Sequence, residues 1–453
     1  MRFLQVLKDL KKVWQYFSFF RQLLENPPPT VPYQPSKHEL QQSKQQLERI
    51  LLENILPFWY PKLLDPIVGG YHINHDLHGQ WLGPANKILV PQARTVWFFS
   101  SLSRSRYGTK DHLEFARHGY EFLRNHMWDK EYGGFYWELD STGRVPVNSD
   151  KHLYGQAFGI SALSEYAKAS GDASAFSLAQ ELFQLLETYA YDHQHGGYEE
   201  FFQHNWTPVS ANRKGFRSVP PGIKTMNVHL HLMEAMTPLY ILTRERLVQQ
   251  RLVELILVQS NAVVRKPLSA CTDQYHPNWT PLRGPQFDRV SYGHDLENVW
   301  LLGEACKAAE VSSAPLLDLF QVLFRYALQY GFDELHGGFY DSGPFHARAD
   351  RLEKIWWVQA ESLVCALYLY SLTGEEVYWS CFSRTLAWIS QRQVDWEHGE
   401  WYTRILTTGE PVDAKTGPWK APYHNGRAML RCLELLASFP MLPLFAIPPA
   451  IKL

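Results

Sequence analysis

Apolar residues recur along most of the chain with the spacing of amphipathic helices. Residues 177–192 (SLAQELFQLLETYAYD) and 377–395 (VYWSCFSRTLAWISQRQVD) carry apolar side chains at positions i, i+3, i+4 and i+7, which is typical of a helix that buries one face. Each stretch is long enough for about four helical turns. The pattern therefore predicts a mainly α-helical protein built from similar amphipathic helices.

Paired glycines followed by an aromatic residue separate these helices at nearly constant intervals. The motif occurs as VGGYH, EYGGFYW, HQHGGYEE and ELHGGFYD, with EHGEWYT as a variant. Its first glycines are Gly69, Gly133, Gly196, Gly337 and Gly399, at intervals of 64, 63, 141 and 62 residues. Because the long interval is about twice the others, we expect a sixth, degenerate copy near residues 271–279 (CTDQYHPNW).

A second glycine turn keeps the same phase, since Gly108, Gly171 and Gly374 each precede the next loop glycine by 25 residues. Each unit is thus a helix, a short turn, a second helix and a longer loop with some β character, and six units are expected. Such units cannot bury a face alone and must stack. We predict one all-α domain over residues 38–453, an (α/α)6 barrel of six helical hairpins with short β-hairpin loops at one mouth. An open solenoid is the alternative.

Residues 1–37 stand apart from this repeat as an N-terminal extension. Residues 1–24 are basic and amphipathic, and the five prolines between Pro27 and Pro35 exclude a helix from the linker that follows. The simplest interpretation is a helix that packs back on the barrel or on a second subunit. Binding to a membrane surface is the alternative.

Composition narrows the range of partners. The formal net charge is -2 and no long basic block lies outside the N-terminus, so nucleic acid is not expected to bind. The apolar runs are too short for an integral membrane segment, and the N-terminus lacks an uninterrupted signal-peptide core. Five widely spaced cysteines indicate reduced structural thiols. We therefore expect a cytoplasmic protein. Its aromatic content of 14% suits either a large core or surfaces on which a sugar stacks.

Polar and aromatic groups recur near the start of the first helix after each loop. The residues are Arg94, Tyr154, His231, Trp357 and His424. They lie 25, 21, 35, 20 and 25 residues, respectively, after the first glycine of the preceding loop. In a closed ring of equivalent hairpins, equivalent positions face one mouth of the barrel. We therefore expect these side chains to converge on one cleft.

Two histidines have a carboxylate on the same helix face. His294 and Glu297 are three residues apart in SYGHDLENVW, and Asn227, His231 and Glu234 form a similar stripe. A neighbouring carboxylate favours the charged imidazole and fixes its tautomer, which suits proton transfer. A single pair of this kind is most often structural. Metal binding is a further alternative, but the order is the reverse of the Glu-x-x-His of di-metal bundles, and we predict no metal.

Four segments together resemble the motifs of the N-acylglucosamine 2-epimerase family over roughly residues 40–437. They are TMNVHLHLMEA, SYGHDLENVWLL, KIWWVQAES and WKAPYHNGRA, and within the family they are most similar to the cellobiose 2-epimerase type. The resemblance implies an (α/α)6 barrel, in agreement with the glycine spacing. It also implies an intracellular, cofactor-independent epimerase or isomerase acting at C2 of a reducing sugar. The implied substrates are a cellobiose-type disaccharide, mannose or glucose, and N-acetylglucosamine.

The resemblance assigns catalytic roles to four residues. His294 and His424 match the two catalytic histidines, which lie on opposite faces of C2, and His231 matches the histidine that assists ring opening. Glu297 matches the partner of the first histidine. Proton removal next to a carbonyl needs a positioned base with a pKa near neutrality and a cation at the developing enediolate oxygen.

The resemblance also implies a set of substrate contacts. Arg94 matches the arginine that stabilises the enediolate, and Asn227 matches the residue that helps turn the intermediate. Trp357 and Trp419 match aromatic sugar contacts. The full set of expected substrate-binding residues is Arg94, Tyr154, Asn227, Trp357, Glu361 and Trp419.

Other functions remain open at this point. If one base returns the proton to C1, the product is a ketose and the enzyme is an aldose-ketose isomerase. Helical barrels also host glycosidases that use two carboxylates, although the motifs here are led by histidine. A non-catalytic sugar-binding or docking barrel would use residues 1–37 as its interaction arm. The resemblance is compatible with a homodimer.

Overall fold

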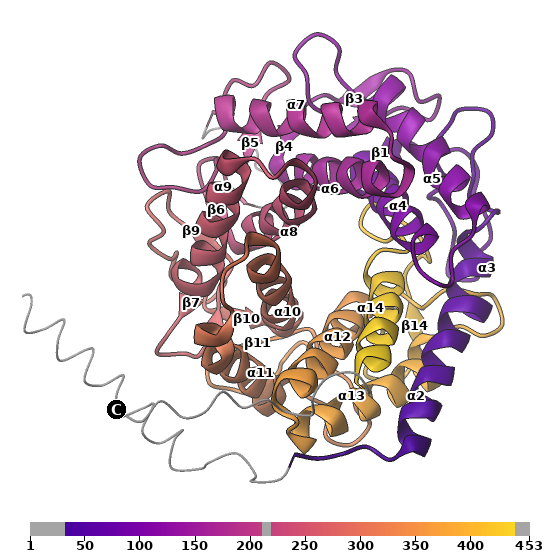
Figure 1. Cartoon of the computed structure of the whole chain (residues 1–453), viewed down its shortest axis with the longest axis vertical. Helices are drawn as coiled ribbons and strands as arrows, with labels where there is room; N and C mark the ends of the chain where they lie inside the picture. Colours follow the sequence, from indigo (N-terminus) through magenta and orange to yellow (C-terminus); the bar gives the residue numbers. More distant parts are fainter. Residues whose placement is uncertain (1–31, 211–218, 440–453) are drawn as a thin grey trace, which may run out of the picture.

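The computed structural model describes residues 32–210 and 219–439, and its helices form two concentric rings (Figure 1). Each inner helix packs on its neighbours, and the last contacts the first, so the ring is closed. This arrangement confirms the predicted (α/α)6 barrel. The inner helices are α4 (Leu89–Ser103), α6 (Leu153–Ser170), α8 (Met226–Thr243), α10 (Tyr292–Ala309), α12 (Trp356–Thr373) and α14 (His424–Ser438).

The outer ring is completed by a helix from the N-terminal end of the described chain. Helix α2 (Lys37–Arg49) packs on α14, so the sixth hairpin joins the two ends of the barrel. Tyr33 already docks on the barrel, because its backbone N–H donates to the carbonyl of Gly374 at 2.9 Å. The predicted extension falls mainly on residues 1–31, outside the described residues. The other outer helices are α5 (Lys110–Phe122), α7 (Ala173–Tyr189), α9 (Arg246–Leu257), α11 (Leu317–Gly331) and α13 (Glu376–Trp388).

Short helical turns border the outer helices. Four are π-helical, and each continues an outer helix toward the next loop: η1 (Ile50–Ile55), η2 (Leu123–Met127), η3 (Val258–Ala262) and η5 (Ile389–Gln393). Helix α3 (Leu56–Trp59) follows η1, and the 3-10 turn η4 (Ala314–Leu316) precedes α11. Gly171 and Gly374 end α6 and α12 with φ angles of 75° and 69°, a left-handed conformation that glycine adopts without a Cβ clash.

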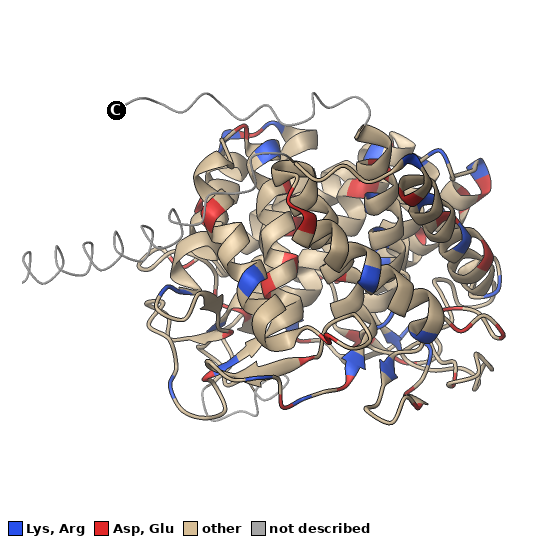
Figure 2. Cartoon of the chain, turned by 90° about the horizontal axis from the view of Figure 1, so that it is seen from below, with Lys and Arg blue, Asp and Glu red and all other residues tan. Residues whose placement is uncertain are grey.

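The strands gather at one end of the barrel, where the inner helices begin (Figure 2). Five of them lead directly into an inner helix and pair with a strand from the loop of the following unit, which ties neighbouring units together. These pairs are β1 (Lys87–Ile88) with β2 (Glu138–Leu139), β4 (Lys151–His152) with β5 (Phe201–Phe202), β6 (Lys224–Thr225) with β9 (Gln274–Tyr275), β10 (Arg289–Ser291) with β11 (Ser342–Pro344), and β12 (Lys354–Ile355) with β13 (Arg404–Ile405). The remaining strands are β3 (Pro146–Asn148), β7 (Val264–Arg265), β8 (Ala270–Cys271) and β14 (Pro411–Val412).

The degenerate sixth loop exists, but it lies slightly earlier than predicted. In each regular loop a residue pairs with the aromatic residue seven positions later, as Leu64 does with Tyr71. The same spacing links Val264 to Cys271, and Ser269 takes the place of the first glycine with a φ angle of 65°. The predicted segment 271–279 therefore begins where this turn ends.

Each inner helix anchors the loop before it through a buried polar side chain in its first turn. In α4 the amide of Gln92 accepts from the N–H of Tyr71 at 2.8 Å and donates to its carbonyl at 2.9 Å. In α10 the corresponding residue is Asp295, whose Oδ1 accepts from the N–H of Cys271 at 3.1 Å. We call the six equivalent positions the anchors: Gln92, Gln156, His229, Asp295, Gln359 and Asn425.

A buried lysine–aspartate pair recurs beneath the loops. Lys151 Nζ lies 2.7 Å from Asp129 Oδ2, and both side chains are fully buried. The equivalent pairs, at 2.6–2.8 Å, are Lys87–Asp65, Lys224–Asp192, Lys354–Asp333 and Lys415–Asp395. In the degenerate unit both partners are replaced, by Arg265 and Val290.

The cysteines are buried and unpaired, as the sequence predicted. Within residues 32–210 and 219–439, no helix combines the length and the apolar character that a membrane span needs.

Candidate functional site

One level of the barrel interior carries most of the candidate chemistry. Two residues after each anchor, and therefore at equivalent heights in the six inner helices, stand side chains that are at most 2% exposed. They include two guanidinium groups, an imidazole and two carboxyl groups. We call them the charged layer: Arg94, Phe158, His231, Glu297, Glu361 and Arg427.

Among the candidate proton-transfer groups, His424 at the start of α14 has the best-defined contacts. Its Nδ1 lies 2.6 Å from Oε1 of Glu361 on α12, and the ring is buried. Burial, together with the positive charges of Arg94 and Arg427, lowers the pKa of His424 well below its ordinary value. The neutral ring that donates Nδ1–H to Glu361 has an unprotonated Nε2, and this atom can accept a proton.

Arg427 connects three carboxyl groups. Its Nη2 donates to Oε1 of Glu297 at 2.7 Å and to Oε1 of Glu361 at 2.8 Å, while its Nη1 donates to Oε1 of Glu234. Burial and repulsion from Glu361 raise the pKa of Glu297 well above its ordinary value. For Glu234 burial acts in the same direction, but Arg427 and His231 outweigh it and lower the pKa to about 2.

His231 belongs to the same network through Glu234. Its Nδ1 lies 2.9 Å from Oε2 of Glu234, whose other oxygen also accepts a hydrogen bond from the hydroxyl of Tyr423. Burial lowers the pKa of His231 despite this carboxylate. His231 and His424 are therefore both neutral rings, each with Nδ1 held by a glutamate.

Arg94 supplies a second buried positive charge. Its Nη2 donates to the Tyr154 hydroxyl at 2.9 Å and its Nη1 donates to the carbonyl of Trp419. The guanidinium carbon lies 4.3 Å from the ring centre of Phe158, and Nε has no hydrogen-bond partner among the described residues. Such a cation can stabilise an oxyanion that forms nearby.

Trp357 contacts both histidines that were predicted to act at C2. The centre of its ring lies 4.8 Å from that of His294 and 5.8 Å from that of His424. His294 is only partly buried, whereas His424 is buried. Trp357 is itself partly exposed, so it can offer a flat apolar surface to a ring between or beside the histidines.

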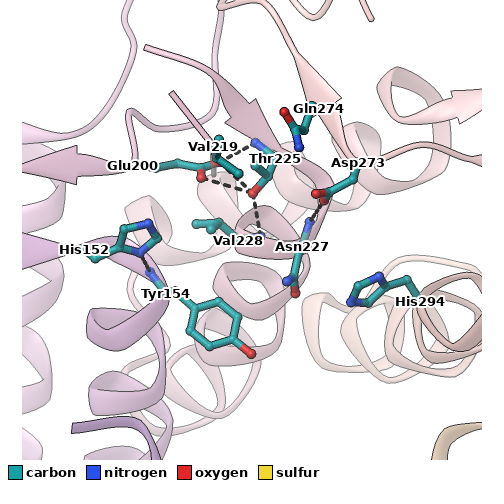
Figure 3. Close-up of a pocket in the computed structure, with 10 residues that line it drawn as sticks. All are labelled: His152, Tyr154, Glu200, Val219, Thr225, Asn227, Val228, Asp273, Gln274 and His294. Atoms are coloured by element: carbon teal, nitrogen blue, oxygen red, sulfur yellow. Dashed lines mark hydrogen bonds between the residues drawn. The ribbon is translucent and has the colours of Figure 1, made fainter. Parts of the chain in front are cut away.

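A cavity of about 180 Å³ opens beside His294. Figure 3 shows Tyr154, Asn227 and His294 facing a common space from three inner helices. Oδ1 of Asn227 is buried without a hydrogen-bond partner among the described residues, so it can accept from a hydroxyl group. The remaining lining residues are His152, Glu200, Val219, Thr225, Val228, Asp273 and Gln274.

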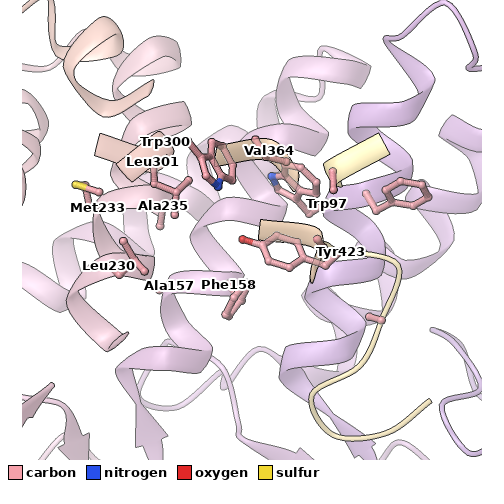
Figure 4. Packing of buried hydrophobic residues seen from close by; sticks show 14 of the residues in the cluster. Trp97, Ala157, Phe158, Leu230, Met233, Ala235, Trp300, Leu301, Val364 and Tyr423 are labelled. Atoms are coloured by element: carbon pink, nitrogen blue, oxygen red, sulfur yellow. The ribbon is translucent and has the colours of Figure 1, made fainter. Parts of the chain in front are cut away.

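Aromatic residues close the barrel around the charged layer. Figure 4 shows Trp97, Trp300 and Tyr423 gathered between the inner helices. The guanidinium carbon of Arg427 lies 4.7 Å from the ring centre of Trp300 and 4.2 Å from that of Tyr423. The three rings are buried and give the charged groups an apolar environment, which strengthens the electrostatic interactions within the layer.

The structure brings the predicted site residues to one mouth of the barrel. They lie on all six inner helices, apart from Trp419 in the loop before α14, and their roles stay predictions. Glu297, expected as the partner of His294, also contacts Arg427 and, at 3.9 Å, His424 Nδ1. Its role beside His294 stays a prediction.

Sequence reasoning missed several groups in this region. Arg427 lies three residues after His424, on the same helix face, and that spacing could have identified it. Glu200 and Asp273 line the cavity from loops, where no periodicity could have identified them. Burial raises the pKa of Glu200 well above its ordinary value.

Three groups of the network also have the chemistry of metal ligands. One atom from each of Glu297, Glu361 and His424 lies within 4.8 Å of the other two. Arg427 Nη2 already bonds both carboxylates, so a positive charge stands where a metal ion would be held. The donor set is therefore satisfied by the protein itself.

A closed helical barrel with histidines, carboxylates and buried arginines at one mouth defines a class of enzymes that act on small polar substrates. Comparison with known proteins gives the family. The model of the family described as N-acylglucosamine 2-epimerase (GlcNAc 2-epimerase) matches residues 69–428. The chain belongs to this family and is a carbohydrate enzyme of the isomerase class.

Individual relatives agree with this assignment. A cellobiose 2-epimerase from Ruminococcus albus is 33% identical over 399 residues, which cover 86% of this chain and 97% of that protein. The solved structure of cellobiose 2-epimerase from Spirochaeta thermophila superposes with a TM-score of 0.79 at 34% identity and covers 91% of this chain and 100% of that one. A D-mannose isomerase from Marinomonas mediterranea is 26% identical over 400 residues, 85% of this chain and 95% of that protein.

Proposed function

We propose that this protein is a sugar 2-epimerase that inverts C2 of a reducing sugar by proton transfer between two histidines. The observation that carries the proposal is the pairing of His424 with Glu361 beside Trp357, which also contacts His294. A base and a second proton-transfer group thus flank one aromatic surface. Such an arrangement suits an inversion at carbon in which the proton leaves one face and a second group delivers a proton to the other.

The reaction begins with the open-chain aldehyde, and His231 is the group we assign to ring opening. Nε2 of His424 then accepts the proton from C2. The electron pair of the broken C–H bond forms the C1–C2 double bond, and the negative charge moves to O1. Arg94 stabilises this enediolate oxygen electrostatically. Protonated His294 delivers a proton to the opposite face of C2, and the aldehyde re-forms at C1.

The remaining residues position the sugar. Trp357 and Trp419 offer faces for ring stacking, and Tyr154 and Asn227 line the cavity that receives the hydroxyl groups. Asn227 Oδ1, buried without a partner among the described residues, is suited to accept a hydroxyl hydrogen bond as the intermediate turns. These assignments follow the family resemblance residue by residue.

The favoured substrate is a cellobiose-type disaccharide, because relatives named cellobiose 2-epimerase are similar over most of the chain. The relative named D-mannose isomerase favours a second candidate, an aldose-ketose isomerase. An epimerase returns the proton to C2, whereas an aldose-ketose isomerase delivers it to C1.

A panel of reducing sugars separates these candidates. Cellobiose, glucose, mannose and N-acetylglucosamine are incubated with the protein, and the products are identified by NMR. The proposal expects a C2 epimer from at least one of them, and His424→Asn and His294→Asn are expected to remove turnover. A ketose as the sole product would replace the proposal by the isomerase. Binding without conversion of any sugar would contradict both.

A further inference from the structure

The two guanidinium groups and three carboxyl groups near His424 balance in charge. Glu234 and Glu361 contribute two negative charges when ionised, and Arg94 and Arg427 contribute two positive charges. Glu297 keeps its proton, because burial and repulsion from Glu361 raise its pKa well above the ordinary value. With His231 and His424 neutral, the buried group therefore carries no net charge.

Arg427 determines this balance through direct contacts. It is at most 2% exposed, and its two terminal nitrogens bond carboxyl groups from α8, α10 and α12. Both bonds of Nη2 end on oxygens that also lie near His424 Nδ1, at 2.6 Å for Glu361 and 3.9 Å for Glu297. Arg427 therefore acts on His424 through these two carboxyl groups.

We propose that Arg427 is a positioning residue that fixes the charge of the carboxyl cluster and thereby keeps His424 neutral, with its proton on Nδ1 and its Nε2 open to the substrate. This inference rests on the proposed function, since it assigns the base of that reaction its resting state. Without Arg427 one buried negative charge would remain uncompensated, and the cluster would take up a proton from solvent.

That proton would disable the base at either place it could bind. On His424 it would occupy Nε2. On Glu361 it would be donated to Nδ1, and the ring would change to the tautomer that carries hydrogen on Nε2. In both cases the added proton must leave before Nε2 of His424 can act as the base. Activity would therefore need a higher pH.

Burial and Arg94 also lower the pKa of His424, but its other charged and titratable neighbours have hydrogen-bond partners other than Glu297 and Glu361. Arg94 on α4 is bonded to Tyr154 on α6 and to the carbonyl of Trp419. On α8, His231 is bonded to Glu234. On α14 itself, Tyr423 donates to the same glutamate. Among the described residues, Arg427 is the cation that bonds Glu297 and Glu361 directly.

The test compares Arg427→Met, which removes the charge at similar length, with Arg427→Lys, which keeps it. Activity is followed from pH 5 to pH 10. For Arg427→Met we expect kcat/KM at pH 7 to fall by about tenfold or more, with much of the loss recovered above pH 9, because one buried charge strongly shifts its neighbours. Arg427→Lys should keep an acidic limb close to that of the wild type. A uniform loss in Arg427→Met with an unmoved acidic limb would overturn the proposal.

A second measurement does not depend on turnover. With imidazole-labelled protein, NMR titration reports the protonation and tautomer of His424, whose signals are assigned by their absence from His424→Asn. The wild type should stay neutral with hydrogen on Nδ1 below pH 6.5, and Arg427→Met should take up a proton at higher pH. Should Arg427→Met fail to fold, Glu234→Gln is used instead. The pKa of Glu234 is lowered to about 2 and its charge raises the pKa of His424, so its removal should make His424 more acidic. An unchanged His424 titration in the variant that folds would overturn the proposal.

The two measurements separate this inference from the proposed function. If the wild-type protein converts no sugar while His424 titrates as expected, the epimerase proposal is rejected and the role of Arg427 in the charge of the cluster is retained. Turnover with an unaltered titration in the variants keeps the epimerase and rejects the role of Arg427.

Discussion

Nδ1 of His424 lies 2.6 Å from Oε1 of Glu361, although the two residues are 63 positions apart in the chain. The contact joins α14 to α12 inside the closed ring. It fixes which nitrogen of His424 carries hydrogen, so the catalytic proposal depends on it directly.

Replacing Glu361 with glutamine should therefore lower kcat by roughly 10²- to 10⁴-fold, because an amide can present N–H to Nδ1 and favour the wrong tautomer. The measurement is steady-state kinetics with the best sugar of the panel. Glu304→Gln is the matched control, since that side chain is 33% exposed and pairs with Arg431. Wild-type kcat in a folded Glu361→Gln variant would contradict this account of His424.

The pH dependence of the wild-type enzyme follows from the burial of His424. Because the folded-state pKa of this residue lies well below the usual 6.5, the neutral base persists as the pH falls through 6.5. We expect kcat/KM to keep its plateau there and to decline only at lower pH. A pH-rate profile measured within the range where the protein stays folded checks this, and a half-maximal point at 6.5 or above would contradict it.

The repeated lysine–aspartate pair gives a prediction about stability. Burial lowers the pKa of Lys151 to about 8 although Asp129 opposes the shift. Lys151→Met leaves the Asp129 carboxylate buried without its cation, and we expect a loss of about 3–5 kcal/mol in the free energy of unfolding. In the degenerate unit the lysine and the aspartate are lost together, with Val290 and Arg265 in their places.

Denaturant unfolding measures this loss. Lys168→Met serves as the control, because the Lys168 side chain is 29% exposed and its Nζ lies 3.7 Å from Glu165. This change should stay within about 1 kcal/mol. Equal stability of the two variants would show that the recurring pair contributes nothing.

Asp295 is the carboxyl-bearing member of the anchor set, and its substitution by asparagine should stabilise the protein as the pH rises. Burial raises the pKa of Asp295 to about 8, against the opposing hydrogen bond from Cys271 N–H. The folded state thus binds more protons than the unfolded state between about pH 4 and pH 8, and stability decreases with rising pH in that window. Asp295→Asn supplies the neutral amide that glutamine provides in α4, α6 and α12.

The stability difference between Asp295→Asn and the wild type should therefore grow with pH, by up to about 1.4 kcal/mol per pH unit across this window. Chemical unfolding at pH 5, 6, 7 and 8 gives the slope, and Asp295→Ala, which lacks the hydrogen bond, is the control. A difference independent of pH would show that Asp295 does not bind its extra proton.

The spacing of the glycines predicted the fold because their loops require a specific backbone geometry. Gly69, Gly133 and their equivalents mark the end of each unit, and equal intervals between them imply equal helical hairpins. The degenerate loop was placed late because Ser269 takes the left-handed conformation that glycine takes elsewhere. Nothing in the pattern indicated that α2 completes the ring, since that pairing joins residues almost 400 positions apart.

The site was predicted in part, for a related reason. Equal phase in the repeat brought Arg94, His231 and His424 to one mouth, as the barrel requires. Pairing between different inner helices has no local sequence signal. The contacts of Glu297 with Arg427 and of Glu361 with His424 therefore could not be predicted from their spacing. The repeat predicts how far along its inner helix a side chain lies, but not which of the other inner helices it faces.

Solvent exchange at the reacting carbon tests the central claim most directly. The protein is incubated with the sugar of the panel that it converts in D₂O, and the product is examined by NMR. Two-histidine epimerisation predicts deuterium at C2 of the inverted product, with no label entering in His424→Asn. An inverted product that carries only its original hydrogen at C2 would contradict the account.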